Sequence, residues 1–310
     1  MSAISVTGLR KTYGSLVAVG DLSFEVRAGE VYALLGHNGA GKTTTIEILE
    51  GHRERTSGEV SVLGMDPGRG GRELRDRIGI VLQTSGIEPE LSVREAVRLY
   101  GACYRSPRSV DEVIALVGLD EKADARIGSL SGGQRRRIDL ALGIVGRPEL
   151  VFLDEPTTGF DAAARRRSWE LVQSLCADGT TVLLTTHYLD EAEHLADRVG
   201  VMVDGTMVAE GTPDELIGAT AETTVAFSLP AGADPTVLPA ALRGIGRLVI
   251  GDGGRVEFTS STPTADLHTL TAWALDQGIE LHSLSVQRPS LEDVFLKLSN
   301  DEIATAEDVG

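Results

Sequence analysis

Apolar residues along the chain form runs that predict two kinds of strand. Residues 4–9 and 22–27 alternate between apolar and polar positions, which is typical of strands with one exposed face. The apolar runs at 31–35 and 150–153, and the segment 180–186 with its β-branched threonines around an apolar centre, instead indicate strands that are buried on both faces. We expect these buried strands to belong to one parallel sheet.

A second pattern, with helical spacing, lies between these runs. One apolar stripe of an amphipathic helix is formed by Val93, Ala96, Val97, Tyr100 and Tyr104. The segments 92–95 and 109–112 both read S-x-x-E, a capping box that predicts the start of a helix. The pattern therefore predicts a helical insert of about 86–135, packed through its stripe.

The pattern changes again beyond residue 217, which we take as the end of the first domain. Residues 221–300 predict a small accessory domain of the α+β class. Its expected strands are 223–230, 247–250, 255–259 and 279–286, and its expected helices are 235–243 and 265–277. This β-α-β-β-α-β order is that of a ferredoxin-like unit. The acidic tail, 301–310, is predicted to be disordered.

Composition narrows the classes of function. The 310 residues suffice for about two domains, and 42% apolar with 24% charged residues is typical of a soluble globular protein. No stretch approaches the ~18 apolar residues that span a bilayer, and the first ten residues do not resemble a signal peptide. Two cysteines, Cys103 and Cys176, are too few for a disulfide framework, so we expect reduced packing residues. The net charge of −17 disfavours binding to nucleic acid and unaided adhesion to anionic lipid.

The most informative motif is the sequence GHNGAGKT at 36–43, between the buried run 31–35 and a predicted helix. It matches the P-loop pattern G-x-x-x-x-G-K-[ST], in which glycines let the backbone fold around a phosphate. Lys42 is expected to reach the β- and γ-phosphates, and the Thr43 hydroxyl to join a Mg²⁺ shell. The predicted nucleotide-binding residues are Gly36, His37, Asn38, Gly39, Ala40, Gly41, Lys42, Thr43 and Thr44.

Two carboxylates, Asp154 and Glu155, follow the buried run 150–153. In P-loop proteins an aspartate at the end of such a strand anchors Mg²⁺, so Asp154 is the second predicted metal ligand. Glu155 is placed to orient or deprotonate the attacking water. His187 follows the run 180–186. An isolated histidine is usually structural, but ligands bind at this end of parallel strands.

Three further features allow more than one interpretation. Tyr13 could stack on an adenine ring or serve only in packing. Ser131 is a plausible helix cap, and the glycines at 132–133 would let an anion approach the helix start. The three arginines at 135–137 could form a nucleic-acid patch, but a solvated helix face is the favoured interpretation.

Together these motifs resemble the nucleotide-binding domain of ATP-binding cassette (ABC) transporters over about residues 4–215. The family's motifs occur here in its order: the aromatic A-loop (Tyr13), Walker A (36–43), the Q-loop (Gln83), the signature (130–134), Walker B (150–155) and the H-loop (His187). The D-loop keeps Asp161, but it has Phe160 and Ala162 where the family usually has Leu and Pro. Residues 188–193 and 287–295 are similar to daunorubicin-resistance-type export ATPases.

The resemblance implies an α/β P-loop ATPase with a mixed sheet, an N-terminal antiparallel subdomain and a helical insert. It implies ATP and Mg²⁺ as cofactors, with Thr43, Gln83 and Asp154 around the metal. It assigns Glu155 as the base, with His187, Gln83 and Lys42 beside the γ-phosphate. It also implies a head-to-tail homodimer in which the other subunit completes each site. The residues that do so are Ser131, Gly132, Gly133, Gln134 and Asp161.

The expected function is the ATPase subunit of a drug or antibiotic exporter. Such a subunit works with a separate transmembrane permease at the cytoplasmic face of the cell membrane, touching the membrane only through that permease. The alternative is a soluble, non-transport ABC ATPase that acts on the ribosome or DNA. That class usually has two cassettes or long coiled coils, and this chain has one cassette, no sustained heptads and an acidic charge. A purely regulatory ATP-binding module is disfavoured by the intact Glu155.

Overall fold

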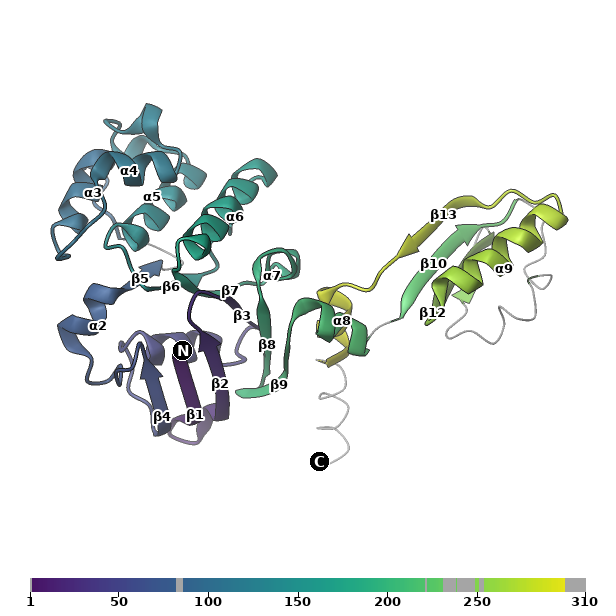
Figure 1. Cartoon of the computed structure of the whole chain (residues 1–310), viewed down its shortest axis with the longest axis horizontal. Coiled ribbons are helices and arrows are strands. Elements are labelled where there is room, and N and C mark those ends of the chain that lie inside the picture. The colour runs from purple at the N-terminus through teal and green to yellow at the C-terminus, as the bar shows by residue number, and fades with distance from the viewer. Residues whose placement is uncertain are drawn as a thin grey trace. The chain divides into compact units, whose positions relative to one another are not determined.

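The computed structural model of the chain describes residues 2–81, 86–220, 222–230, 238, 249–250 and 254–298. The chain divides into two compact units, residues 1–213 and 214–310, whose elements Figure 1 labels. The first domain was expected to end at residue 217, which lies inside helix α8 (Pro213–Thr220). The structure instead starts the second unit with this helix.

An antiparallel sheet begins the first unit. It has the order β2-β1-β4, formed by β1 (Ser2–Tyr13), β2 (Leu16–Arg27) and β4 (Ser57–Val62). The first two strands are longer than the alternation predicted, because β1 and β2 stay paired up to Tyr13 opposite Leu16. Their apolar positions, among them Ile4, Leu9 and Leu22, lie in the main hydrophobic core.

The central sheet has the order β5-β6-β7-β3-β8-β9. Its strands are β3 (Val31–Gly36), β5 (Ile78–Val81), β6 (Leu150–Asp154), β7 (Thr181–Thr185), β8 (Arg198–Val203) and β9 (Thr206–Gly211). The pairings from β5 to β8 are parallel, and β9 is antiparallel to β8, so the sheet is mixed as expected. The three predicted runs are buried and adjacent. Their carboxyl ends therefore meet at one edge of the sheet, where ligands bind in such folds.

Helices of the first unit connect these strands. Their bounds are α1 (Lys42–Leu49), α2 (Gly71–Arg77), α3 (Val93–Gly101), α4 (Val110–Leu116), α5 (Gly132–Ile144), α6 (Ala162–Ala177) and α7 (Leu189–Leu195). The insert is confirmed, with α3, α4 and α5 packed together (Figure 1). Ser92 forms a full capping box with Glu95, whereas Ser109 caps α4 without the reciprocal bond. Tyr100 departs from the expected stripe and is 40% exposed. Cys103 is exposed too, so it is not the packing residue that we expected.

The second unit contains an antiparallel sheet with the order β11-β12-β10-β13, which is the ferredoxin-like strand order. Its elements are β10 (Thr223–Ser228), β11 (Val249–Ile250), β12 (Arg255–Ser260), α9 (Pro263–Asp276) and β13 (His282–Gln287). Val225, Phe227, Phe258 and Leu270 form its core. A last helix at 291–298 is capped by Ser290. Of the expected helix at 235–243 only residue 238 is described, and the tail at 301–310 lies outside the described residues.

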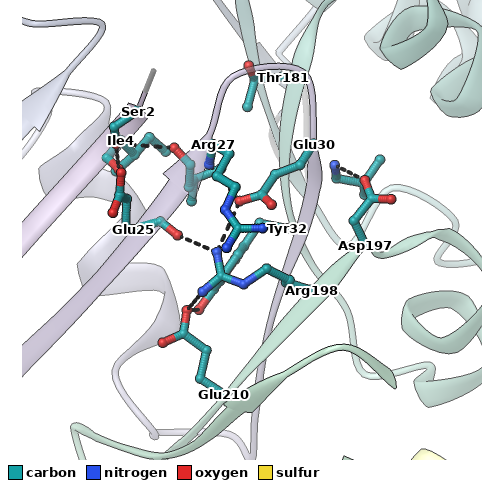
Figure 2. A network of polar contacts seen from close by, with 12 residues as sticks. Ser2, Ile4, Glu25, Arg27, Glu30, Tyr32, Thr181, Asp197, Arg198 and Glu210 are labelled. Atoms are coloured by element: carbon teal, nitrogen blue, oxygen red, sulfur yellow. Dashed lines mark hydrogen bonds and ion pairs between the residues drawn. The ribbon is translucent and has the colours of Figure 1, made fainter. Parts of the chain in front are cut away.

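A network of polar contacts lies at the amino end of β3, where the strand begins (Figure 2). The Arg198 guanidinium donates to Glu30 Oε1 at 3.3 Å, to the Glu25 carbonyl oxygen at 2.9 Å and to the Glu210 carboxylate. Tyr32 donates from its hydroxyl to Glu210 at 3.0 Å and lies beneath the guanidinium. Burial raises the pKa of Tyr32, and the Glu210 carboxylate raises it further. The network ties β2, β3, β8 and β9 together away from the carboxyl end of β3.

Candidate active site

A loop at 36–41 joins β3 to α1 and passes close to neighbouring backbone. A Cβ atom on Gly36 would lie 2.5 Å from the Met202 carbonyl oxygen, and one on Gly41 would lie 2.4 Å from that of Ala18. Gly41 also has a φ of 96°, in the left-handed region that glycine tolerates. Only glycine therefore fits these two positions of the P-loop pattern without displacing the backbone.

The loop borders a cavity of about 400 Å³ at the carboxyl edge of the central sheet. Its lining residues are Ala18, Asn38, Gly39, Gly41, Lys42, Thr43, Thr44, Asp154 and Glu155. Six of these come from the predicted P-loop set. Two more are the predicted carboxylates, Asp154 and Glu155, and the ninth, Ala18, was not predicted. The structure thus brings the end of β6 and the start of α1 to one cavity.

Lys42 is held by the loop in which it occurs. Its Nζ atom donates to the carbonyl oxygens of Gly36 at 2.6 Å and His37 at 3.0 Å. Burial lowers the pKa of Lys42, while the nearby carboxylates of Glu155 and Asp154 raise it. The ammonium group is thereby fixed at the cavity wall.

Two of the predicted P-loop residues have side chains directed elsewhere. The His37 ring contacts Asp204 Oδ1 through Nε2 at 3.3 Å, and Ala40 is fully buried in the core. Both residues occupy positions that the P-loop pattern leaves open to any residue, so neither side chain needs to face the cavity.

The end of β6 has an unusual backbone. Thr185, at the end of β7, donates from Oγ1 to Asp154 Oδ1 at 2.5 Å and orients that carboxylate. The next residue, Glu155, has a φ of 47°, which costs a non-glycine residue about 1–2 kcal/mol. Its amide donates to the Thr185 carbonyl oxygen at 3.0 Å. A strained residue held in this way at a cavity indicates a functional position.

Glu155 and His187 contact each other across adjacent strands. His187 Nδ1 lies 3.2 Å from Glu155 Oε1, and Thr158 donates to the second carboxylate oxygen at 3.2 Å. The Tyr188 ring packs on the imidazole, with 4.0 Å between the ring centroids. The structure therefore brings the predicted base and the predicted histidine into direct contact.

The segment 131–134 has a different position. Ser131 caps α5, accepting from the Gln134 amide at 3.3 Å, and Gln134 Oε1 accepts from the Ser131 amide in return. Among the described residues that line the cavity, none belongs to this segment. Asp161 likewise caps a helix, α6, by accepting from the Ala164 amide at 2.7 Å. Within one chain these two segments therefore do not complete the cavity.

Tyr13 is another predicted residue that is absent from the described lining of the cavity. Tyr13 accepts a hydrogen bond from Arg53 Nη1 at 2.5 Å, and Lys11 and Arg53 lie near its ring. The ring is 40% exposed, so it is not the buried packing residue of the alternative interpretation. Gln83 lies outside the described residues.

Arg136 is a residue whose place the sequence did not predict. The run 135–137 was interpreted as a solvated helix face, but Arg136 is only 7% exposed. Its guanidinium donates to the carbonyl oxygens of Asp154, Glu155 and Pro156. The interpretation was wrong for this arginine because α5 packs against the end of β6. The available signal was that Arg136 precedes Asp139 and Leu140, both buried, by three and four positions and so shares a helix face with them.

Comparisons with known proteins agree with this geometry. A family model described as ABC transporter matches residues 19–158, and one described as ABC transporter domain-containing protein-like, C-terminal domain, matches residues 223–290. A Nod factor export ATP-binding protein I from Rhizobium johnstonii is 39% identical, covering 97% of this chain and 96% of that protein. The daunorubicin resistance ATP-binding protein DrrA3 from Streptomyces coeruleorubidus is 37% identical, covering 97% of each.

A solved structure extends the comparison to the fold. It is a dimeric, post-hydrolysis ATP-binding cassette bound to ADP and Pi, with 26% identity and a TM-score of 0.62. The match covers 67% of this chain and 98% of that one.

Proposed function

This chain belongs to the ATP-binding proteins of ABC transporters, and from that premise we propose that it is the ATP-hydrolysing subunit of an exporter. The relatives that it matches over nearly their whole length are named for Nod factor export and daunorubicin resistance. A drug-like or antibiotic-like cargo follows from that similarity. The observation that carries the proposal is the single cavity that collects Lys42, Thr43, Asp154 and Glu155.

The P-loop residues are proposed to hold the triphosphate. Lys42 presents a fixed cation at the cavity wall, where it would neutralise phosphate charge. The start of α1 lies beside it and adds the partial positive charge of a helix N-terminus. Tyr13 would contact the adenine ring after its contacts with Lys11 and Arg53 rearrange.

The residues present also fit a Mg²⁺ ion. The Thr43 hydroxyl and the Asp154 carboxylate line the same cavity, and oxygen atoms of this kind are the ligands that Mg²⁺ prefers. Gln83 is proposed as a further ligand. When bound, the ion would offset the negative charge of the phosphate oxygens.

Glu155 is proposed as the general base, with His187 beside it. The Glu155 carboxylate reaches the cavity, and His187 and Thr158 orient its two oxygens. A carboxylate held in this way can accept a proton from an attacking water. His187 would then contact the γ-phosphate from the carboxyl end of β7.

A second copy of the chain is proposed to close the site. Ser131, Gly132, Gly133, Gln134 and Asp161 do not line the cavity of their own chain, so they are available to the cavity of a partner. A head-to-tail homodimer would place the start of α5 against the nucleotide held by the other subunit. The similar solved cassette is a dimer bound to ADP and Pi, which supports a dimer for this chain.

A separate membrane subunit is proposed as the second partner. In the described part of the chain, no helix has the length and apolar character needed to cross a bilayer. We therefore place the protein at the cytoplasmic face of the cell membrane, bound through a permease. The charge of −17 favours a protein partner over nucleic acid or lipid.

The test is the variant Glu155→Gln. We expect ATP binding to persist, because the P-loop residues are unchanged. Steady-state turnover should fall by ~10²–10⁴-fold, because the general base is lost. Size-exclusion chromatography with ATP should then show an accumulated dimer. The matched control is Glu170→Gln, which removes an exposed carboxylate from α6 and should leave turnover unchanged. Wild-type turnover in Glu155→Gln would remove Glu155 from this role.

A further inference from the structure

We infer that Arg136 is a positioning residue whose guanidinium holds the backbone turn that presents Glu155 to the nucleotide cavity. The inference rests on the proposed function, in which Glu155 acts on the attacking water. It assigns a specific task to a residue that neither touches the cavity nor belongs to the P-loop.

Arg136 reaches the turn from a different element. It lies in the second turn of α5, and its side chain passes to the end of β6. The Nη2 atom donates to the carbonyl oxygens of Asp154 at 2.6 Å and Glu155 at 2.9 Å. The Nε atom donates to the Pro156 carbonyl oxygen at 3.2 Å. Three consecutive carbonyl groups thus accept from one buried side chain.

The turn needs such a partner because its conformation is unfavourable by itself. Glu155 is in the left-handed region, with a φ of 47°, and the turn directs three carbonyl dipoles toward the same space. Buried carbonyl groups require donors. Two other bonds hold the turn: the Glu155 amide donates to Thr185, and the Glu155 carbonyl oxygen accepts from the Thr158 amide.

A guanidinium is suited to this task for a chemical reason. It is planar and presents five N–H donors in a fixed fork, and it stays charged when buried. A lysine ammonium has no planar fork and would not serve three separated acceptors in the same geometry. Asp139, one turn along α5, lies 3.8 Å from Nη1 and offsets part of the buried charge.

The same side chain connects two segments of the proposed site. Helix α5 begins with the segment 132–134, which the proposed dimer places on the partner's nucleotide. Arg136 therefore ties that helix start to the turn that carries Glu155. A displacement of this contact would move the backbone that carries the Glu155 carboxylate.

The first experiment substitutes Arg136 by Gln in the full chain and measures kcat, the Kd for ATP and the thermal midpoint. We expect kcat to fall about 10- to 100-fold, because small misplacements of supporting and reacting groups have effects of this size. The Kd for ATP should change less than about threefold, since the P-loop residues are untouched. Arg136→Lys keeps the buried charge and serves if the glutamine variant does not fold; its kcat should fall less, at an unchanged Kd.

The matched control is Arg166→Gln, which removes an exposed arginine from α6 and should leave all three quantities unchanged. A role in stability alone would lower the thermal midpoint but leave the kcat of the folded, ATP-binding protein at the wild-type value. That result in both Arg136 variants would overturn the inference.

A double-mutant cycle with Glu155→Gln distinguishes an effect of Arg136 that acts through the Glu155 carboxylate from an independent effect on hydrolysis. If Arg136 acts through the carboxylate, Arg136→Gln should lower single-turnover hydrolysis by less than about twofold once that carboxylate is absent. Losses that multiply would overturn the inference. Wild-type turnover in Glu155→Gln alone would instead refute the proposed role of Glu155, which is a different failure.

Discussion

The central sheet carries charged side chains at both ends, and the two ends arrange them differently. At the amino end, Arg198 is surrounded by Glu30, Glu210 and the Glu25 carbonyl group, and Tyr32 covers it (Figure 2). At the carboxyl end, Asp154 and Glu155 share a cavity with the cation of Lys42. The first arrangement pairs opposite charges closely, whereas the second gathers groups beside an open space.

A further carboxylate, that of Glu50, interacts with Asp154 at this end of the sheet. Glu50 follows the last turn of α1 and is buried. Burial raises the pKa of Glu50 to about 8, and the Asp154 and Glu47 carboxylates contribute to the increase. The comparison teaches that one end of the sheet pairs its charges within the fold, while at the other end the phosphates of a nucleotide would offset the Lys42 cation and a bound cation would offset the carboxylates. The following predictions test that difference, beginning with the largest effect.

Substituting Lys42 by Ala should affect activity far more than stability. Removing a fixed donor to a transferring phosphoryl group costs about 100- to 1000-fold in rate, and we expect ATPase activity to fall by that amount. The thermal midpoint should stay the same or rise, because burial disfavours the Lys42 charge. Steady-state kinetics and thermal melts would check both effects. Lys122→Ala, at an exposed lysine, is the control. Unchanged ATP affinity in Lys42→Ala would contradict the site.

Substituting Arg198 by Met should affect stability far more than activity. Loss of this cation leaves the Glu30 carboxylate, which is 7% exposed, without its main partner. Removing one member of a buried pair costs about 3 kcal/mol, so the thermal midpoint should fall by roughly 6–12 °C. Turnover of the folded protein, measured at a low temperature, should remain within about twofold of wild type.

The pair of the exposed Arg105 and the partly buried Asp76, 3.6 Å apart, provides the control for that experiment. Arg105→Met should shift the midpoint by less than about 2 °C, because exposed pairs contribute little. A large loss of turnover at low temperature in Arg198→Met would show that the two ends of the sheet are not separate in function.

Substituting Glu50 by Gln should change stability by an amount that depends on pH, and at about pH 5 it should have the smallest of these effects. The pKa of Glu50 is raised from 4.5 to about 8 on folding. Below about pH 4.5 the group is protonated in both states. Between that value and about pH 8 the unfolded state loses its proton first, so wild-type stability falls as the pH rises.

We therefore expect the variant to exceed wild type in thermal midpoint by about 2–3 °C at about pH 5 and by more as the pH rises toward about 8. Melting curves across this range would measure the difference, with the exposed Glu59→Gln as a control. A difference that does not depend on pH would show that Glu50 is ionised in the folded protein.

Much of the site could be predicted because its functional groups belong to short segments of characteristic sequence. The P-loop pattern, the two carboxylates after a buried strand and the histidine after another each depend on a few adjacent residues. The order of the parallel strands then places Gly36, Asp154 and Thr185 at one edge, so the residues expected to meet there do meet. The relatives that the chain matches are ATP-binding proteins of ABC transporters, the family that the motifs predicted.

Other parts could not be predicted because distant segments decide them. The three arginines at 135–137 look alike in the sequence, and only the packing of α5 against the end of β6 buries the second. The left-handed conformation of Glu155 has no signal in residue type, since glutamate rarely adopts it. The Arg198 network likewise joins residues 168 positions apart, as in the contact with Glu30.

By itself, the sequence determined the periodicity of the strands and helices, the caps at Ser92 and Ser131, and the residue types around the nucleotide cavity. These features follow from contacts within a few residues, where spacing and side-chain chemistry suffice. Only the tertiary structure decided which charges are paired, which are buried and which share the cavity. Burial and pairing depend on the packing of segments far apart in the chain, and the free energy of a charge is set by those surroundings.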